Sequence, residues 1–100
     1  MSQTRNYLAF DLGAESGRAV VGRFDGERLT LTPIHRFANT PVSVLGSLYW
    51  NILRLFDEMK VGLGKYRRDK DGPLDGIGID TWGVDFGLLD ANGQLLATPR

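Results

Sequence analysis

The chain has 100 residues, enough for one domain or for part of a larger one, and its 42% hydrophobic and 24% charged content is typical of a soluble globular protein. Twelve basic and twelve acidic residues cancel, so the net charge gives no reason to expect a nucleic acid or an anionic membrane as partner. The absence of cysteine excludes disulfides and thiolate metal sites, and the absence of a signal-peptide or membrane-spanning pattern leads us to expect a cytoplasmic protein.

The first part of the sequence predicts three strands joined by short turns. Residues 6–12 are almost continuously apolar, as in a strand that is buried on both faces. Residues 18–24 form the second strand, and Asp25-Gly26 predicts a hairpin turn into a third strand over residues 27–37. Pro33 favours an edge position for this third strand, because proline cannot donate a hydrogen bond to a neighbouring strand. The three strands are therefore expected to form an antiparallel meander.

An amphipathic helix is predicted after a loop over residues 38–47. Its apolar residues recur at helical spacing, at Ile52, Phe56, Met59, Leu63 and Tyr66. We expect Asn51 to cap the helix and Gly72-Pro73 to end it. Gly62 and Gly64 each weaken a helix by roughly 1 kcal/mol relative to alanine, so the last turns are expected to be loose.

Two more strands are predicted over residues 76–80 and 84–89, followed by a turn at residues 90–93 and a strand-like run over residues 94–97. The coarse order is β-β-β-α-β-β, a mixed sheet of the α/β class. A helical crossover returns the strand at 76–80 parallel to the first strand. Because no helix closes the pattern, we expect the chain to be the first piece of a longer protein.

Both central strands of this sheet end in an aspartate, Asp11 and Asp80. The carboxyl ends of parallel strands meet at one edge of a sheet, where ligands bind in open α/β folds. The turn that follows the first strand, in the sequence DLGAESGR, has the composition of a phosphate-binding turn. Its glycines let backbone N–H groups approach an anion, and Arg18 can clamp a phosphate. The alternative is a plain hairpin turn, with Asp11 as its cap and Arg18 in solvent.

The sequence DTWGVDF, residues 80–86, suggests a sugar site. Acids accept hydroxyl protons, an aromatic ring covers an apolar sugar face, and Gly83 lets a ligand approach the backbone. The alternative is a β-turn with a tryptophan in the core. Three other features are interpreted as structural: an exposed His35, a Tyr49-Trp50 pair that packs near the helix start, and a solvated helix face that carries Asp57, Glu58 and Lys60.

The segments AFDLGAESGR, LYWNILRLFDEM and GIGIDTWGVDF together resemble the N-terminal part of the FGGY carbohydrate kinases, and within them the rhamnulokinases. The resemblance implies the ribonuclease-H-like fold of the actin-like ATPase and sugar kinase superfamily. Residues 1–100 would be the N-terminal part of the first kinase domain, with the ATP phosphate loop and part of the sugar site. The implied activity of the parent protein is transfer of the ATP γ-phosphate to the 1-hydroxyl of L-rhamnulose, in rhamnose metabolism, with Mg²⁺.

The resemblance also implies roles for individual residues. Asp11 would face the metal through water, and Gly83 would touch the sugar, with Trp82 as a second candidate. The ATP phosphates would be held by the loop residues Gly13, Ala14, Glu15, Ser16, Gly17 and Arg18. The general base of these kinases lies downstream, outside this chain, so no catalytic residue is assigned here.

Three positions depart from the family pattern. Ala14 stands where many FGGY kinases have a hydroxyl residue, which removes a side-chain contact to phosphate. Glu15 replaces a small polar residue, and we expect its carboxylate to point away from the phosphates. Asn51 stands where aspartate is frequent, a change that concerns capping alone.

Two alternative functions remain open on the sequence. A different FGGY kinase, for xylulose, fuculose or glycerol, would keep the first motif and change DTWGVDF. A non-catalytic actin-like module would bind ATP without phosphoryl transfer. In either case we expect this chain alone to be inactive as a kinase, and to self-associate because one helix cannot cover both faces of its sheet.

Overall fold

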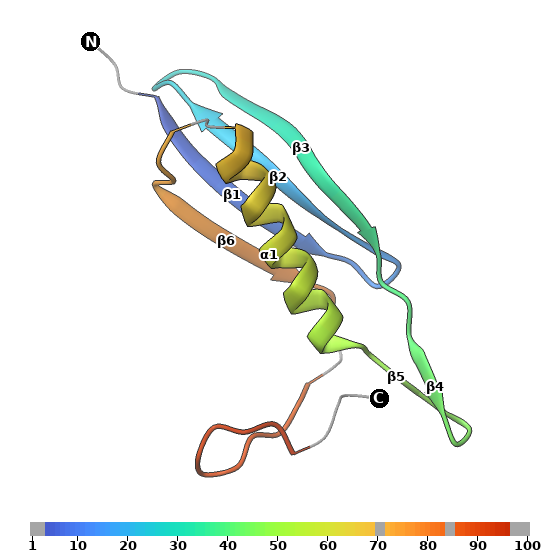
Figure 1. Cartoon of the computed structure of the whole chain (residues 1–100). Helices are drawn as coiled ribbons and strands as arrows, with labels where there is room; N and C mark the ends of the chain where they lie inside the picture. Colours follow the sequence, from blue (N-terminus) through green and yellow to red (C-terminus); the bar gives the residue numbers. More distant parts are fainter. Residues whose placement is uncertain (1–3, 70–71, 84–85, 97–100) are drawn as a thin grey trace.

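The computed structural model describes residues 4–69, 72–83 and 86–96. Figure 1 shows the elements in chain order: β1 (Arg5–Leu12), β2 (Ser16–Phe24), β3 (Leu29–Ala38), β4 (Val42–Val44), β5 (Ser47–Tyr49), α1 (Ile52–Asp69) and β6 (Gly76–Thr81). The main sheet has four strands in the order β3-β2-β1-β6, and β4 and β5 pair separately. The antiparallel meander and the parallel pairing of β6 with β1 are both confirmed.

The turn between β2 and β3 forms as its residues predict. Gly26 has a φ of 101°, a left-handed conformation that glycine adopts without steric cost. The Asp25 Oδ1 atom accepts hydrogen bonds from the backbone N–H groups of Glu27 and Arg28, at 2.9 and 2.7 Å. These bonds lower the pKa of Asp25, because they favour the charged carboxylate. β3 is an edge strand, in agreement with Pro33.

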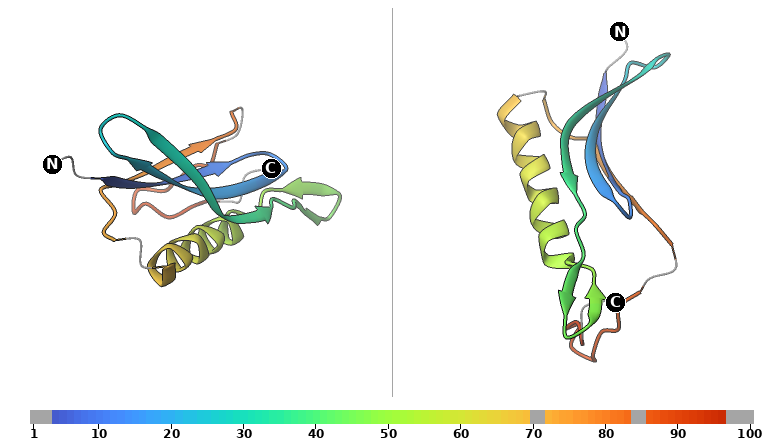
Figure 2. Two further views of the ribbon diagram at one scale, coloured as in Figure 1. Left: turned by 90° about the horizontal axis from the view of Figure 1, so that it is seen from above. Right: turned by 90° about the vertical axis from the view of Figure 1, so that its right-hand side faces the viewer.

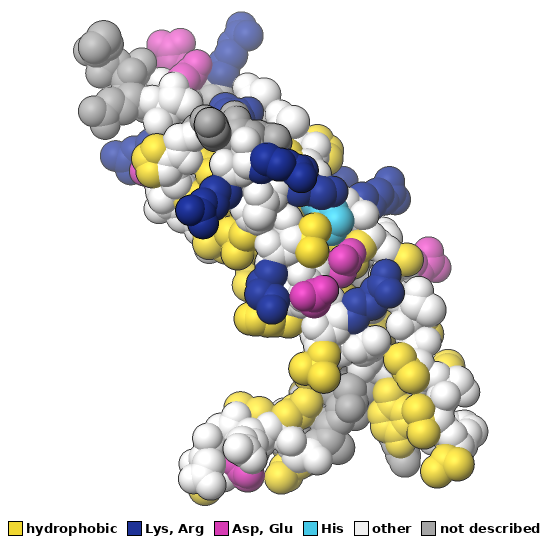
Figure 3. Space-filling model, in the orientation of Figure 1, with side chains coloured by type: hydrophobic (Ala, Val, Ile, Leu, Met, Phe, Trp, Pro, Cys, Tyr) yellow, Lys and Arg dark blue, Asp and Glu magenta, His cyan; other side chains and the backbone are white. Residues whose placement is uncertain are grey.

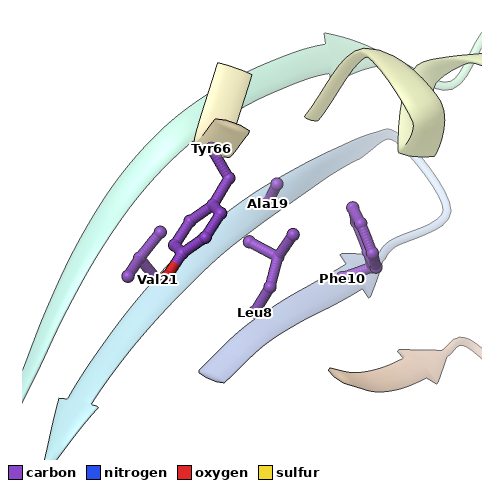
Figure 4. Close-up of a cluster of buried hydrophobic side chains, with 5 residues drawn as sticks. All are labelled: Leu8, Phe10, Ala19, Val21 and Tyr66. Atoms are coloured by element: carbon purple, nitrogen blue, oxygen red, sulfur yellow. The ribbon is translucent and has the colours of Figure 1, made fainter. Parts of the chain in front are cut away.

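The helix α1 lies across one face of the sheet and leaves the other face open (Figure 2). Asn51 caps it as predicted, because its Oδ1 accepts the N–H of Arg54 at 3.2 Å. Figure 4 shows the core under the helix, where Tyr66 points towards side chains of β1 and β2; the buried cluster consists of Leu8, Phe10, Ala19, Val21 and Tyr66. This cluster fixes the helix on β1 and β2.

Gly62, predicted to loosen the helix, has a packing role instead. A Cβ at this position would lie 3.0 Å from the Ala19 Cβ and 3.2 Å from Cε1 of Phe10. The helix therefore approaches the sheet closely at Gly62, and it continues regularly to Asp69. The close packing of α1 on the sheet at Gly62 compensates for the low helix propensity of glycine.

The expectation that β1 is buried on both faces is wrong for the described residues. Burial alternates along the strand, with Leu8 and Phe10 buried and Tyr7 and Ala9 exposed. The reason is that α1 covers one face of the sheet only. Leu31, which is 64% exposed, extends the same apolar surface onto β3. Self-association of the chain through this open face stays a prediction.

Two element predictions are corrected. The segment over residues 38–47 is not all loop, since it holds β4 and the start of β5, joined by Leu45 and Gly46 in left-handed conformation with φ of 49° and 81°. Of the strand predicted over residues 84–89, residues 84–85 lie outside the described residues, and the rest contribute only an isolated bridge between Leu89 and Leu95. The turn between these two leucines is confirmed, because Asp90 Oδ1 accepts the N–H groups of Asn92 and Gln94, each at 2.9 Å.

His35 is not the exposed strand residue that the sequence suggests. Its side chain is only 10% exposed, and its Nε2 atom lies 3.3 Å from Oε2 of Glu58. The Nδ1 atom lies 2.7 Å from Nζ of Lys65, so His35 joins β3 to two turns of α1. Glu58 therefore faces the sheet rather than solvent, while Asp57 and Lys60 are exposed as expected. Within the described part of the chain, no helix is long and apolar enough to span a membrane.

Candidate functional site

Three charged side chains stand in a row near the carboxyl ends of β1 and β6. The strand register pairs Asp11 of β1 with Asp80 of β6 on one side and with Arg18 of β2 on the other. All three lie on the open face, because the buried residues Phe10 and Leu12 beside Asp11 face α1. They line a shallow pocket of about 360 Å³ that also includes Val20 and Gly78. The predicted meeting of the two acids at one sheet edge is thus present.

The charges in this row act on one another. The Nε atom of Arg18 lies 3.2 Å from Oδ2 of Asp11, in a pair whose side chains are 56% and 43% exposed. The pKa of Asp80 is raised, chiefly by a side-chain hydrogen bond with Asp11, then by desolvation and by repulsion from the same carboxylate. Arg18 opposes this shift. Two carboxylates so placed favour a bound cation, since a cation would replace their mutual repulsion with attraction.

The turn from β1 to β2 is tight, and two of its glycines are required by its geometry. The N–H of Gly13 donates to the carbonyl of Ser16 at 3.0 Å, and a Cβ on Gly13 would lie 2.8 Å from that oxygen. A Cβ on Gly17 would clash with the ring of Phe37. Ala14 and Glu15 are exposed at the tip of the turn.

Asn39 holds this turn in place through two hydrogen bonds. This role was not predicted from the sequence. It is 4% exposed, and its Nδ2 donates to the carbonyl of Gly13 at 3.0 Å. Its backbone N–H donates to the carbonyl of Glu15 at 2.9 Å. The two bonds tie the tip to the end of β3 and fix its shape before any ligand arrives. The signal in the sequence was a single amide residue just after the third strand, which identifies no partner by itself.

Trp82 and Gly83 follow β6 at the same edge of the sheet. The N–H of Trp82 donates to the carbonyl of Leu12 at 3.2 Å, so the chain after β6 stays beside the end of β1. The Trp82 ring packs on that of Trp50, with centroids 4.6 Å apart and planes at 52°. Trp50, predicted to be a packing residue, therefore also orients a candidate sugar-binding residue.

Gly83 has no conformational need to be glycine. It is not among the described residues with positive φ, and a Cβ there would meet no atom of those residues within 4 Å. Its backbone is exposed at the end of β6. A backbone surface left free in this way is what a ligand hydroxyl would need for close approach.

The structure thus brings the predicted site residues to one edge of the sheet: Asp11, the turn residues Gly13, Ala14, Glu15, Ser16, Gly17 and Arg18, and then Trp82 and Gly83. Asp80 joins them through the strand register. Asp85, the other acid of the second motif, lies outside the described residues. The site is polar on the open face and apolar on the helix face.

No family model matches the chain. Solved structures that share its fold include two sugar kinases. A gluconate kinase from Lactobacillus acidophilus superposes with a TM-score of 0.74 over 97% of this chain, at 13% sequence identity. A ligand-bound xylulose kinase from the same organism gives a TM-score of 0.73 over 95% of this chain, at 14% identity. The chain spans 19% of the length of each of these kinases. Its mixed sheet with one covering helix is therefore the fold of part of a sugar kinase, as predicted.

Proposed function

We propose that this chain is the N-terminal part of a carbohydrate kinase that transfers the γ-phosphoryl group of ATP to the 1-hydroxyl of L-rhamnulose. The observation that carries the proposal is the row of Arg18, Asp11 and Asp80 beside a preformed glycine turn. Phosphoryl transfer depends mainly on positioning and on charge stabilisation, and this edge of the sheet supplies groups for both. The shared fold of the gluconate and xylulose kinases supports a kinase over other ATP-binding proteins.

In this proposal each group has a separate task. The exposed backbone of the turn, with Arg18, contacts the phosphates of ATP. Asp11 would hold a Mg²⁺ ion indirectly, through water, and this ion would supply positive charge that stabilises the transferring group. Trp82 and the backbone of Gly83 hold the sugar so that its hydroxyl faces the γ-phosphate. The residue that removes the hydroxyl proton is expected in sequence beyond this chain.

A kinase for a different sugar is the alternative favoured by a specific observation, since two of the structural neighbours are a gluconate kinase and a xylulose kinase. A thermal-shift screen of the longer protein, with a Mg²⁺-bound ATP analogue and a panel of sugars, separates the possibilities. We expect L-rhamnulose to raise the melting temperature beyond the analogue alone. A larger shift with xylulose, fuculose, gluconate or glycerol would favour that sugar. Stabilisation by the nucleotide without any sugar response would favour a non-catalytic ATP-binding module.

A further inference from the structure

One buried asparagine binds two peptide groups of the turn between β1 and β2. Asn39 follows the end of β3 and is 4% exposed. Its Nδ2 donates to the carbonyl of Gly13 at 3.0 Å, and its backbone N–H donates to the carbonyl of Glu15 at 2.9 Å. A third carbonyl of the turn, that of Ser16, accepts the N–H of Gly13 at 3.0 Å. Three acceptors of the turn are therefore already satisfied by the protein itself.

The two bonds from Asn39 also determine which way two N–H groups point. No described residue has a cis peptide bond, and in a trans peptide the C=O and N–H groups point in opposite directions. The carbonyl of Gly13 shares its peptide with the N–H of Ala14, and that of Glu15 shares its peptide with the following N–H. Because Asn39 holds both carbonyls on its own side, both N–H groups point away from it. N–H groups that face one side of a turn can bind an anion.

Side-chain charge does not by itself attract a phosphate to this turn. Arg18 faces two carboxyl groups in the row described above, those of Asp11 and Asp80. Glu15 adds another carboxylate at the tip of the turn. The face of the molecule that carries α1 shows Lys and Arg side chains mixed with Asp and Glu (Figure 3). Recognition of a phosphate here therefore depends chiefly on the backbone N–H groups and on what holds them in place.

We propose that Asn39 is a positioning residue for phosphoryl transfer, which keeps the peptide between Gly13 and Ala14 turned so that a phosphate meets its N–H and not its carbonyl. The inference rests on the proposed kinase function and adds a residue outside the turn to its nucleotide site. Glycine permits a flip of this peptide more readily than other residues, because it has no Cβ. A flipped peptide would present an acceptor to the phosphate oxygens and repel them. Donors that are fixed before the ligand binds cost no reorganisation.

The expected effect of losing the Asn39 side chain is confined to ligands that carry phosphates. Asn39→Ala removes the Nδ2 donor and keeps the backbone N–H that binds Glu15. One hydrogen bond changes an equilibrium constant by about 3- to 10-fold, and the apparent Kd rises as the competent fraction of the protein falls. In the longer protein we expect the Kd for a Mg²⁺-bound ATP analogue to rise about 3- to 10-fold, and the KM for ATP to rise with it. The Kd for adenosine and the KM for L-rhamnulose at saturating ATP should stay unchanged, because neither ligand contacts the turn in the proposed complex.

A second variant and a matched control accompany Asn39→Ala. Asn39→Leu has a similar branched shape without polar atoms, so it removes the same donor and fills the space that alanine leaves open. It should weaken the ATP analogue as Asn39→Ala does. Asn6→Ala is the control, because Asn6 is also buried, at 8% exposed, but pairs with Arg23 at the opposite end of β1 from the turn. It should leave the Kd for the ATP analogue unchanged even where it lowers the melting temperature.

Hydrogen exchange of the wild-type protein gives a further readout that requires no variant. The backbone amide of Ala14 should exchange more slowly with the ATP analogue bound than with adenosine bound, because a phosphate oxygen accepts its hydrogen bond. This measurement decides the question if neither Asn39 variant folds. Equal exchange rates at Ala14 with the two ligands would overturn the inference.

The binding outcomes separate this inference from the proposed function. Wild-type protein that binds the ATP analogue, with a Kd that both Asn39 variants leave unchanged, would overturn the inference and leave the kinase function in place. Equal weakening of adenosine, or an equal effect of Asn6→Ala, would overturn it too, because the effect would not be local to the phosphates. Folded wild-type protein that binds no nucleotide would contradict the proposed function and the inference with it. Weaker binding of the ATP analogue alone, in the Asn39 variants alone, is the result we expect.

Discussion

The replacement of Gly83 by valine distinguishes a ligand-binding glycine from a structural one. Among the described residues, a Cβ at this position meets no atom within 4 Å, and Gly83 is not one of those with positive φ. The expected cost to folding is therefore that of an ordinary surface substitution, within about 0.5 kcal/mol. The valine side chain would instead occupy the space in which we place the sugar.

The expected effect on activity follows from the geometry of transfer. A displacement of about 1 Å at the reacting hydroxyl costs on the order of 100-fold in rate, or about 2.7 kcal/mol of transition-state stabilisation. We expect Gly83→Val in the longer protein to raise the KM for L-rhamnulose, to lower kcat and to leave the affinity for an ATP analogue unchanged. Steady-state kinetics, nucleotide titration and a melting curve on one preparation measure all three.

A matched control is available on the helix. Gly64 also has open space around its Cβ position, but it lies on α1, so Gly64→Ala should add about 1 kcal/mol of stability and leave the sugar KM unchanged. An unaltered KM in Gly83→Val would remove Gly83 from the sugar site. A lower melting temperature, with sugar and nucleotide affinities reduced alike, would mean that the glycine serves the fold.

Three further changes test other parts of the site. Asp11→Ala should lower kcat about 100-fold at saturating Mg²⁺ and keep the fold, because the exposed Asp11–Arg18 pair contributes at most about 1 kcal/mol; a near-native kcat would contradict the role of Asp11. Gly17→Ala forces a clash with the ring of Phe37 and should lower the free energy of unfolding, measured in urea, by about 1–3 kcal/mol. An unchanged midpoint of the urea unfolding curve would show that the Phe37 ring moves aside at no cost. Asp80→Asn should be more stable than the wild type at neutral pH. The raised pKa means that the Asp80 carboxyl holds its proton more tightly in the folded state than in the unfolded chain, so the stability that the protonated carboxyl contributes is lost as pH rises. The difference in melting temperature between Asp80→Asn and the wild type should therefore vanish below about pH 3. A difference that persists there would contradict this account.

Local chemistry made much of the fold predictable. Asp25-Gly26 identified the hairpin, the spacing of apolar residues identified α1, and Asn51 identified its start. The right-handed crossover rule then set β6 parallel to β1, which brought Asp11 and Asp80 together. These features depend on residues close in sequence or on a general rule of topology.

The features that were missed depend on contacts between distant segments. Asn39 supports the turn at Gly13, and His35 lies between Glu58 and Lys65, through pairings that no periodicity encodes. The hairpin of β4 and β5 was not predicted, because its strands are three residues long and its turn places Leu45 in a left-handed conformation, which few leucines adopt. Gly62 was interpreted by propensity alone, although its packing against Phe10 decides its role.

The most direct test of the proposed function is a coupled assay of ADP release by the longer protein, with Mg²⁺-ATP and L-rhamnulose, alongside xylulose, gluconate and glycerol. We expect ADP release that depends on the sugar, is fastest with L-rhamnulose and falls about 100-fold in Asp11→Ala. Folded protein that binds the nucleotide but releases no ADP with any sugar would contradict the assignment of this site to a sugar kinase.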